Sequence, residues 1–308
     1  MENTWESLKT CGLTIFFGLY CTLFQHLFRE LYKSDFFISI LDFMPSSETT
    51  ESYTLRSKIS TQERFIVAHR GSSGTAPENT ISSIRHAISA GALMVEVDVQ
   101  ITSDHKAILM HDQVLGRTTN GRGFVRAHTL EQLDTLDAGS WFNTSFRGEH
   151  IPLLTEALQL LKDNETCVNI EIKPPGKDDD GIERLLVIIE NVLALNMQDV
   201  TLFSSFHHES LRYIKQHYPA FHTAGIHLPG DKRLPSEVAS EIGCEGFVCS
   251  LREITHKKAE DAAKHDILIG VYTINTDDDF NTIMKYQVPA LVSNFPRKIQ
   301  QLLHSTIK

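Results

Sequence analysis

The chain has 308 residues, of which 41% are hydrophobic and 22% are charged, a normal composition for a globular protein with one large or two small cores. Its formal net charge of -10 argues against binding to nucleic acid, because contacts with the phosphate backbone need clustered lysines and arginines. An acidic chain can still bind a small anion where a metal ion or a few placed cations overcome the general field. The five cysteines form no CxxC pair, so we expect buried reduced thiols rather than a zinc ribbon or a disulfide framework.

The beginning of the chain is first apolar and then polar. Residues 1–44 are a hydrophobic segment, but its apolar run 11–24 is too short to cross a bilayer, which takes about 20 helical residues. A cleaved signal peptide is also a poor fit, because the leader is acidic and no small-residue cleavage site follows. We therefore expect a helical arm that binds a membrane surface through residues 11–42, with docking on the protein itself as the alternative. Residues 45–63, rich in serine and threonine, are predicted to form a linker.

Short apolar strands alternate with helical periodicity over the rest of the chain. Strands are predicted at 65–69, 93–101, 167–173, 200–205, 221–228, 246–250, 268–275 and 289–294. Helices are predicted in most of the gaps, at 78–90, 154–163, 181–195, 208–217, 256–265, 277–286 and 297–304. Eight such units in roughly 240 residues predict an α/β fold, a (β/α)₈ TIM barrel over residues 64–308. A doubly wound open sheet is the alternative.

One segment interrupts this alternation. Residues 103–112 are typical of the return arm of a hairpin, with a turn at 103–105. Residues 113–150 carry glycine, asparagine and threonine without a strong period, and we interpret them as a small insertion over the barrel mouth, after the second strand. Phe124 in this insertion and Phe206 after the fourth strand are expected to pack rather than to contact a substrate.

Unexplained acidic residues lie on the predicted strands near their carboxyl ends, where TIM barrels place their working residues. Glu96 and Asp98 are two apart on one strand, so both project from the same face, about 7 Å apart along the chain. Glu171 on the next strand has the same orientation. Three such carboxylates would repel each other and lose hydration unless they share a cation, which predicts a divalent ion with oxygen ligands, Mg²⁺ or Ca²⁺. The alternative is an internal ion pair with Arg70 or Lys173.

Two histidines are expected beside these carboxylates. His69 ends the first strand, and His111 returns from the hairpin toward the same mouth. Such a pair suits acid and base catalysis near neutral pH, where each partner contributes about 10²–10⁴ in rate. A structural role is the alternative, because the chain has 15 histidines and most of them must be surface or packing residues. A dinuclear zinc hydrolase is a further alternative for histidines near carboxylates.

Seven short motifs follow one another over about residues 65–300, namely "HRG", "APENT", "VEVDV", "HD", "RTTNGRG", "NIEIK" and "SSF". In this order they resemble the motifs of the glycerophosphodiester phosphodiesterases. The resemblance implies a metal-dependent TIM barrel that hydrolyses glycerophosphodiesters to sn-glycerol 3-phosphate and an alcohol. It also implies acid and base roles for His69 and His111, cation binding by Glu96, Asp98 and Glu171, and phosphate contacts by Arg70 and Lys173.

Two positions depart from the family pattern. Tyr272 stands where a tryptophan is expected and Asn294 where an aspartate is expected, and we expect both to shape the glycerol end of the pocket. The alternative functions are a lysophospholipase D that acts on membrane lysophospholipids and a noncatalytic phosphate-binding barrel. The apolar arm and the lack of a cysteine framework favour membrane association with the barrel on the cytoplasmic side, and a soluble cytoplasmic protein is the alternative.

Overall fold

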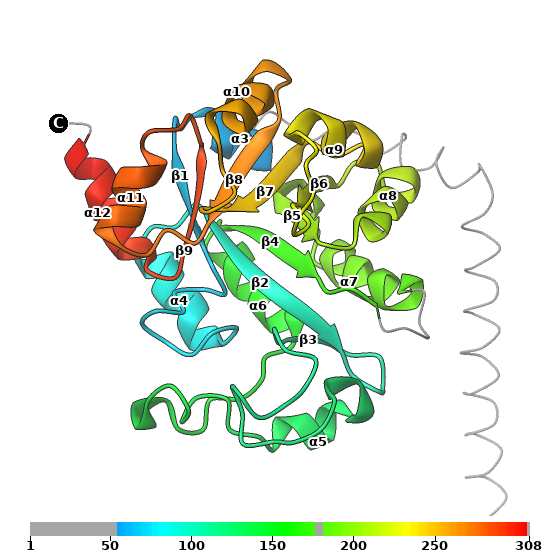
Figure 1. Cartoon of the computed structure of the whole chain (residues 1–308). Coiled ribbons are helices and arrows are strands. Elements are labelled where there is room, and N and C mark those ends of the chain that lie inside the picture. The colour runs from blue at the N-terminus through cyan, green and yellow to red at the C-terminus, as the bar shows by residue number, and fades with distance from the viewer. Residues whose placement is uncertain (1–53, 176–180, 307–308) are drawn as a thin grey trace, which may run out of the picture. The chain divides into compact units, whose positions relative to one another are not determined.

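Short apolar runs form the strands of a closed barrel in the computed structural model of the chain, which describes residues 54–175 and 181–306 (Figure 1). The sheet has nine strands; β3 is antiparallel to β2, and the others are parallel to their neighbours. Because β1 pairs with both β9 and β2, the parallel strands close on themselves. They are β1 (Phe65–Ala68), β2 (Met94–Ile101), β4 (Cys167–Ile172), β5 (Thr201–Ser205), β6 (His222–Ile226), β7 (Gly246–Ser250), β8 (Leu268–Tyr272) and β9 (Ala290–Ser293). The predicted barrel is confirmed, and the open sheet is excluded.

Helices connect the parallel strands and cover the outside of the barrel (Figure 1). They are α4 (Ile81–Ser89), α6 (Leu154–Asp163), α7 (Ile182–Ala194), α8 (His208–His217), α9 (Pro235–Ile242), α10 (His256–Lys264), α11 (Asp277–Ile283) and α12 (Pro296–Thr306), with the short 3₁₀ turn η3 (Gln198–Val200) before β5. The sequence prediction did not include α9. Its signals are Pro235 at the first turn and a left-handed Gly243 at the end.

Helix α4 begins at Ile81, so the predicted start at residue 78 is wrong. Asn79 has a φ of 57°, a left-handed conformation that a helix cannot continue through. Thr80 then caps the helix, because its side chain accepts a hydrogen bond from the backbone N–H of Ser83. The residues between β1 and α4 therefore form a loop that can carry site residues.

The main core lies between the barrel and its helices. On β2, Val95 and Val97 are fully buried, as are Leu154 and Leu158 on α6. Such burial removes about 1.5–3 kcal/mol of unfavourable hydration per large apolar side chain, which holds the helices on the strands. The barrel thereby becomes a rigid frame for the polar residues at its strand ends.

The segment after β2 returns as a hairpin, as predicted. β3 (Ala107–Leu109) pairs with the end of β2, and His105 takes a left-handed φ of 58° in the turn. Residues 113–150 then contain η1 (Val125–Ala127), α5 (Leu130–Asp134) and η2 (Thr144–Phe146), drawn below β2 and β3 in Figure 1. The insertion packs against β3 and its flanking residues around a second apolar cluster, formed by Ile108, Met110, Leu115, Val125, Leu133, Ala138 and Ile151.

Part of the predicted linker is ordered. Helix α3 (Leu55–Ser60) lies within the range 45–63, and its Leu55 is buried in the main core. The predicted hydrophobic arm, residues 1–44, falls outside the described residues. In the stretches that are described, no helix is both long enough and apolar enough to span a membrane. Buried reduced thiols were expected, and Cys167, Cys244 and Cys249 are free and buried. Cys11 and Cys21 lie outside the described residues.

Candidate active site

The sequence-predicted polar residues on β1, β2 and β4 meet at one cavity. This cavity has a volume of about 260 Å³. Five of the predicted site residues line it, namely His69, Arg70, Glu96, His111 and Glu171. Its remaining walls are largely apolar and come from inward-facing residues of the barrel, such as Phe65, Met94, Leu202 and Val292.

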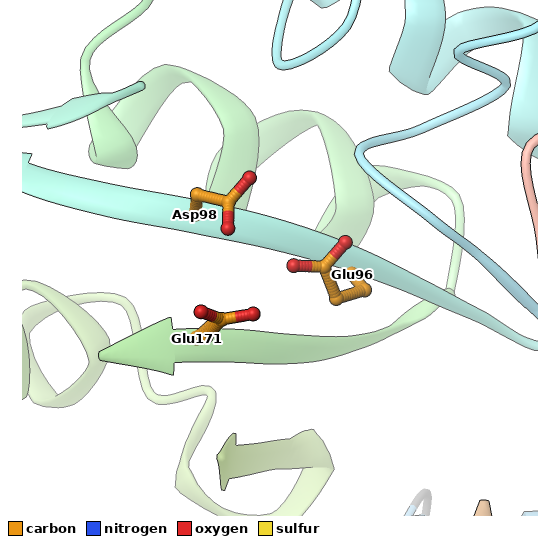
Figure 2. Close-up of side chains that lie close together, drawn as sticks. All are labelled: Glu96, Asp98 and Glu171. Atoms are coloured by element: carbon orange, nitrogen blue, oxygen red, sulfur yellow. The ribbon is translucent and has the colours of Figure 1, made fainter. Parts of the chain in front are cut away.

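Three carboxylates from two neighbouring strands lie together (Figure 2); Glu96 and Glu171 line the cavity, whereas Asp98 is fully buried beside them. The register of β2 and β4 places Asp98 beside Glu171, and Glu96 lies two residues before Asp98. One oxygen from each of the three lies within 4.8 Å of the others, and within the described part of the chain this is the one group of acidic, histidine or cysteine side chains with metal-ligand geometry. Two-residue spacing on a strand thus brings the acidic residues together as predicted.

The three carboxylates differ in their partners. Oε2 of Glu96 accepts a hydrogen bond of 2.7 Å from the backbone N–H of Arg70, whereas its Oε1 is buried without a partner. Burial, with the charges of Asp98 and Glu171, raises the pKa of Glu96 well above its usual value. Burial opposes ionisation of Asp98 as well, but the cations of Lys173 and Arg70 hold its pKa below the usual range. Glu96 is therefore the carboxylate that most lacks a positive charge.

Arg70 and Lys173 both form ion pairs with Asp98. Arg70 Nε lies 3.2 Å from Asp98 Oδ2, and Lys173 Nζ contacts Asp98 Oδ1 and lies 2.5 Å from Glu171 Oε1. The internal ion pair that the sequence left as an alternative is therefore present at Asp98 and Glu171. It does not satisfy Glu96, so the ion pairs account for only part of the carboxylate cluster.

The loop after β1 supplies two residues that contact the predicted site residues and for which the sequence analysis proposed no role. Asn79 donates from Nδ2 to Asp98 Oδ2 at 2.7 Å, and its Oδ1 accepts the backbone N–H of Asp98 at 3.1 Å. Glu78 accepts from Arg70 NH1 at 2.8 Å. Within the tripeptide "PEN", Glu78 thus orients Arg70 and Asn79 orients Asp98. The available signal was its position in the same loop, with five residues between it and "HRG", together with the tolerance of asparagine for a left-handed φ.

His69 is held by the residue that departs from the family pattern. Its Nδ1 donates to Asn294 Oδ1 at 2.7 Å, which leaves Nε2 as the unprotonated ring nitrogen. Burial and the neighbouring Arg70 cation lower the pKa of His69 to about 4, so the ring is neutral at pH 7. Asn294 therefore contacts the histidine itself, a role that differs from the expected one of shaping the glycerol end of the pocket.

His111 is held by a carboxylate instead. Its Nδ1 donates to Asp112 Oδ1 at 2.7 Å, and Asp112 in turn accepts from Arg117 Nε at 2.6 Å. Arg117 also donates to both oxygens of Glu78, at 2.9 and 2.7 Å. A continuous chain of charged hydrogen bonds thus runs from His111 through the insertion to the partner of Arg70.

Two phenylalanines were expected to pack rather than to contact a substrate. Phe206 lines both the cavity and a groove of about 590 Å³ that borders it. Phe124 was expected to pack, and this is wrong, because 50% of the residue is exposed. Tyr272 lines the cavity, and burial, with the negative charges of Glu253 and Glu171, raises its pKa to about 12, which keeps the hydroxyl protonated.

Comparison with known proteins agrees with the barrel fold. Residues 69–298 match the glycerophosphoryl diester phosphodiesterase family. The chain belongs to this family. A glycerophosphodiester phosphodiesterase of Caldanaerobacter subterraneus is 33% identical over 239 residues, which cover 78% of this chain and 97% of the relative. Members of the family are phosphoric diester hydrolases, and this chain is an enzyme of that class.

Two solved structures resemble the barrel of this family member. One is a phosphodiesterase of Oleispira antarctica in complex with the product sn-glycerol-3-phosphate, with a TM-score of 0.74, 29% identity, and coverage of 80% of this chain and 99% of the other. The other is a glycerophosphodiester phosphodiesterase of Agrobacterium tumefaciens, with a TM-score of 0.68, 28% identity, and coverage of 77% and 99%. The family fold therefore spans nearly all of the described chain.

Proposed function

We propose that this glycerophosphodiester phosphodiesterase uses a divalent cation to hydrolyse small glycerophosphodiesters to sn-glycerol 3-phosphate and an alcohol. The observation that carries the proposal is the meeting of Glu96, Glu171, Arg70 and two histidines at one cavity of a family barrel. The product bound to the Oleispira relative supports the identity of the phosphate-bearing product.

The residues present fit a hard cation. The group with metal-ligand geometry holds only carboxylates, and Glu96 Oε1 is a buried oxygen that has no partner within the protein. Oxygen ligands of this kind favour Mg²⁺ or Ca²⁺ over zinc, which prefers histidine and cysteine. We therefore propose Glu96, Asp98 and Glu171 as the ligands. When bound, the cation would neutralise negative charge on the phosphate oxygens.

The protein's own groups supply the proton transfers. The neutral His69 can accept through Nε2 the proton of the glycerol 2-hydroxyl as its oxygen attacks phosphorus, because Nδ1 already donates to Asn294. His111, backed by the carboxylate of Asp112, can donate a proton to the departing alcohol oxygen, which leaves a cyclic phosphate. Water then opens the cyclic phosphate to sn-glycerol 3-phosphate, with the two rings in exchanged roles. Arg70 is a fixed cation at the cavity, held by Glu78 and Asp98, and can stabilise charge that grows on the phosphate. Lys173 is proposed as a second phosphate contact once its carboxylate partners bind the cation.

A second candidate substrate is a lysophospholipid, cleaved by the same chemistry as a lysophospholipase D. Two features favour it, namely the apolar walls of the cavity and the neighbouring groove lined by Val114, Leu115 and Phe206. An acyl chain leaving the catalytic residues along this groove would replace water on these side chains. The noncatalytic barrel has no comparable support, since every residue that the chemistry needs is present.

We also retain the proposal that residues 11–42 bind a membrane with the barrel on the cytoplasmic side; their apolar composition is its support. A deletion that tests this should end before Leu55, because that residue is buried in the core of the barrel. Removal of residues 1–52 is then expected to move the protein from the membrane fraction to the supernatant. If the shortened protein stays in the membrane fraction, the proposal that residues 11–42 bind the membrane is contradicted.

The proposed function is tested by a substrate panel. Purified full-length protein is assayed with glycerophosphocholine, glycerophosphoethanolamine and lysophosphatidylcholine, each with Mg²⁺, Ca²⁺ or excess chelator. Release of sn-glycerol 3-phosphate that needs the cation and is lost in Glu171→Gln supports the proposal. Release of lysophosphatidic acid alone favours the second candidate, and product formation that is unaffected by chelator refutes the cation.

A further inference from the structure

A short two-stranded ribbon within the insertion exposes apolar side chains beside the active site. Leu115 N–H donates to Gly123 O at 2.8 Å and Val125 N–H donates to Gln113 O at 2.9 Å, and Val114 and Phe124 form a β-bridge between them. Because side chains alternate along a strand, the bridge fixes which residues face inward.

This alternation sends two apolar side chains to the surface. Leu115 and Val125 are 6% and 1% exposed and belong to the apolar cluster of the insertion, whereas Val114 and Phe124 are 46% and 50% exposed. Only the inward pair belongs to this apolar cluster. The outward pair would be expected to be polar if water were its permanent neighbour.

Positive charge surrounds this exposed pair. Arg122 and Arg126 are both exposed, and the Arg126 guanidinium lies 5.6 Å from the centre of the Phe124 ring. Residues 113–128 hold three arginines and no aspartate or glutamate, although the whole chain has a net charge of -10. Arg117 is paired with Asp112 and Glu78, so Arg122 and Arg126 supply the local positive charge. The four side chains of Val114, Arg122, Phe124 and Arg126, named here the insertion tip, therefore combine an apolar centre with a local positive field.

The insertion tip reaches the groove beside the catalytic residues through Val114. Val114 and Leu115 line the groove of about 590 Å³, whose other walls include His111, Glu171 and Lys173. A phosphodiester in this groove would have its phosphate at the catalytic residues and its other end at the insertion tip. A lipid surface, whose headgroups are phosphodiesters, would present a substrate to the groove in this orientation.

We propose that the insertion tip docks on an anionic lipid surface and so places the mouth of the active site against the headgroups. A lipid bilayer fits better than a protein partner, because two exposed apolar side chains provide far less than the roughly 800 Å² per partner of a standard protein interface. Insertion of a few apolar side chains flanked by arginines is by contrast a usual way to bind an anionic membrane. The proposal goes beyond the proposed hydrolysis, and the test below does not depend on catalysis.

The test reads the environment of position 124 in the full-length protein. The wild-type chain has two tryptophans, Trp5 and Trp141, and Phe124→Trp adds a third whose signal is obtained by subtraction. Vesicles of phosphatidylcholine and phosphatidylserine carrying brominated acyl chains are expected to quench the added tryptophan. Ile182→Trp, at an apolar position 36% exposed on α7, is the matched control and should show no added quenching.

Charge variants then test the arginines. Arg122→Gln with Arg126→Gln, in the Phe124→Trp background, should weaken docking of the insertion tip about 25-fold, since each arginine near an anionic surface contributes roughly fivefold. Most of the added quenching is then lost even in protein that residues 11–42 hold on the vesicle. Arg147→Gln, an exposed arginine elsewhere in the insertion, should leave the added quenching unchanged. No added quenching at position 124, or equal quenching at 124 and 182, would overturn the proposal. Quenching that the arginine pair does not affect would overturn the anionic surface as its partner.

Discussion

Replacing Asn79 with alanine removes the side chain that orients Asp98 from the loop after β1. Asn79 is only 4% exposed, and its amide makes two hydrogen bonds to Asp98, one to the carboxylate at 2.7 Å and one to the backbone N–H at 3.1 Å. Its φ of 57° is a conformation that asparagine and glycine accept more readily than alanine. The substitution therefore removes two contacts and strains the backbone.

These terms set the expected loss of stability. A hydrogen bond to a charged group contributes about 1.5–3 kcal/mol, and a buried N–H left without an acceptor costs about 1–3 kcal/mol. A left-handed alanine adds roughly 1 kcal/mol. Because the lost contacts share one partner, they do not add fully, and we expect a fall of about 3–5 kcal/mol in the free energy of unfolding, or roughly 6–20 °C in Tm.

The assay combines unfolding with cation binding. Denaturant unfolding in excess chelator gives the free energy for Asn79→Ala, and calorimetric titration with Mg²⁺ or Ca²⁺ gives the affinity. We expect the affinity to fall about 10–100-fold, as is usual when a residue that orients a metal ligand is lost. Asn79→Gly should lose the same affinity but retain roughly 1 kcal/mol more stability, because glycine accepts the backbone conformation.

Asn191→Ala is the control for loss of a buried asparagine. Asn191 is partly buried on α7 and donates to the Val187 carbonyl at 2.7 Å, in a hydrogen bond that is local to the helix. It should lower stability slightly and leave cation affinity unchanged. If Asn79→Ala unfolds within about 1 kcal/mol of wild type and binds the cation equally well, the orienting role of this loop is refuted.

Three further predictions concern the histidines. His69→Gln and His111→Gln should each lower kcat about 10²–10⁴-fold without a large change in Tm; equal activity in either variant would remove that ring from the chemistry. Lowering the pH from 6.5 toward 4 should destabilise the protein, because the unfolded His69 ring takes up a proton near 6.5 whereas burial and Arg70 hold the folded pKa at about 4. At pH 5 the loss is about 2 kcal/mol relative to pH 7, measured by denaturant unfolding in chelator, and it should be absent from the His69→Gln variant. Asn294→Asp places a carboxylate at His69 Nδ1, now 2.7 Å from the Asn294 amide oxygen, and should move the acidic limb of the kcat/KM profile to higher pH; an unchanged profile would contradict the contact.

Much of this site could be predicted because strand geometry is simple. Side chains two apart on a strand share a face, so Glu96 and Asp98 had to lie together, and Glu171 joined them once parallel order was known. His111 could be placed because the hairpin pairing returns it to the level of Asp98, whose carbonyl accepts the N–H of Met110 at 2.9 Å. The regular geometry of strands and hairpins thus allowed the positions of these site residues to be predicted from the sequence.

The residues that the sequence left without a role lie in loops. Glu78 and Arg117 meet across the gap between the β1–α4 loop and the insertion, a contact that no local period encodes. The placement of Phe124 was wrong for a related reason, because its hydrophobicity suggested burial whereas the bridge to Val114 decides which way it faces. Such contacts depend on pairing between segments, which hydrophobic pattern alone does not determine.

The most direct test of the account is a calorimetric titration of a divalent cation into the full-length protein, with Glu96→Gln and Glu171→Gln as variants. The three carboxylates, one with a buried oxygen that has no partner, predict one cation per site for the wild type, and an affinity at least tenfold weaker in each variant. Hydrolysis of glycerophosphocholine at a fixed cation concentration should rank the wild type and the two variants in the same order as their cation affinities. Wild-type affinity in both variants, or hydrolysis that continues after exhaustive chelation, would contradict the claim that these carboxylates hold the catalytic cation.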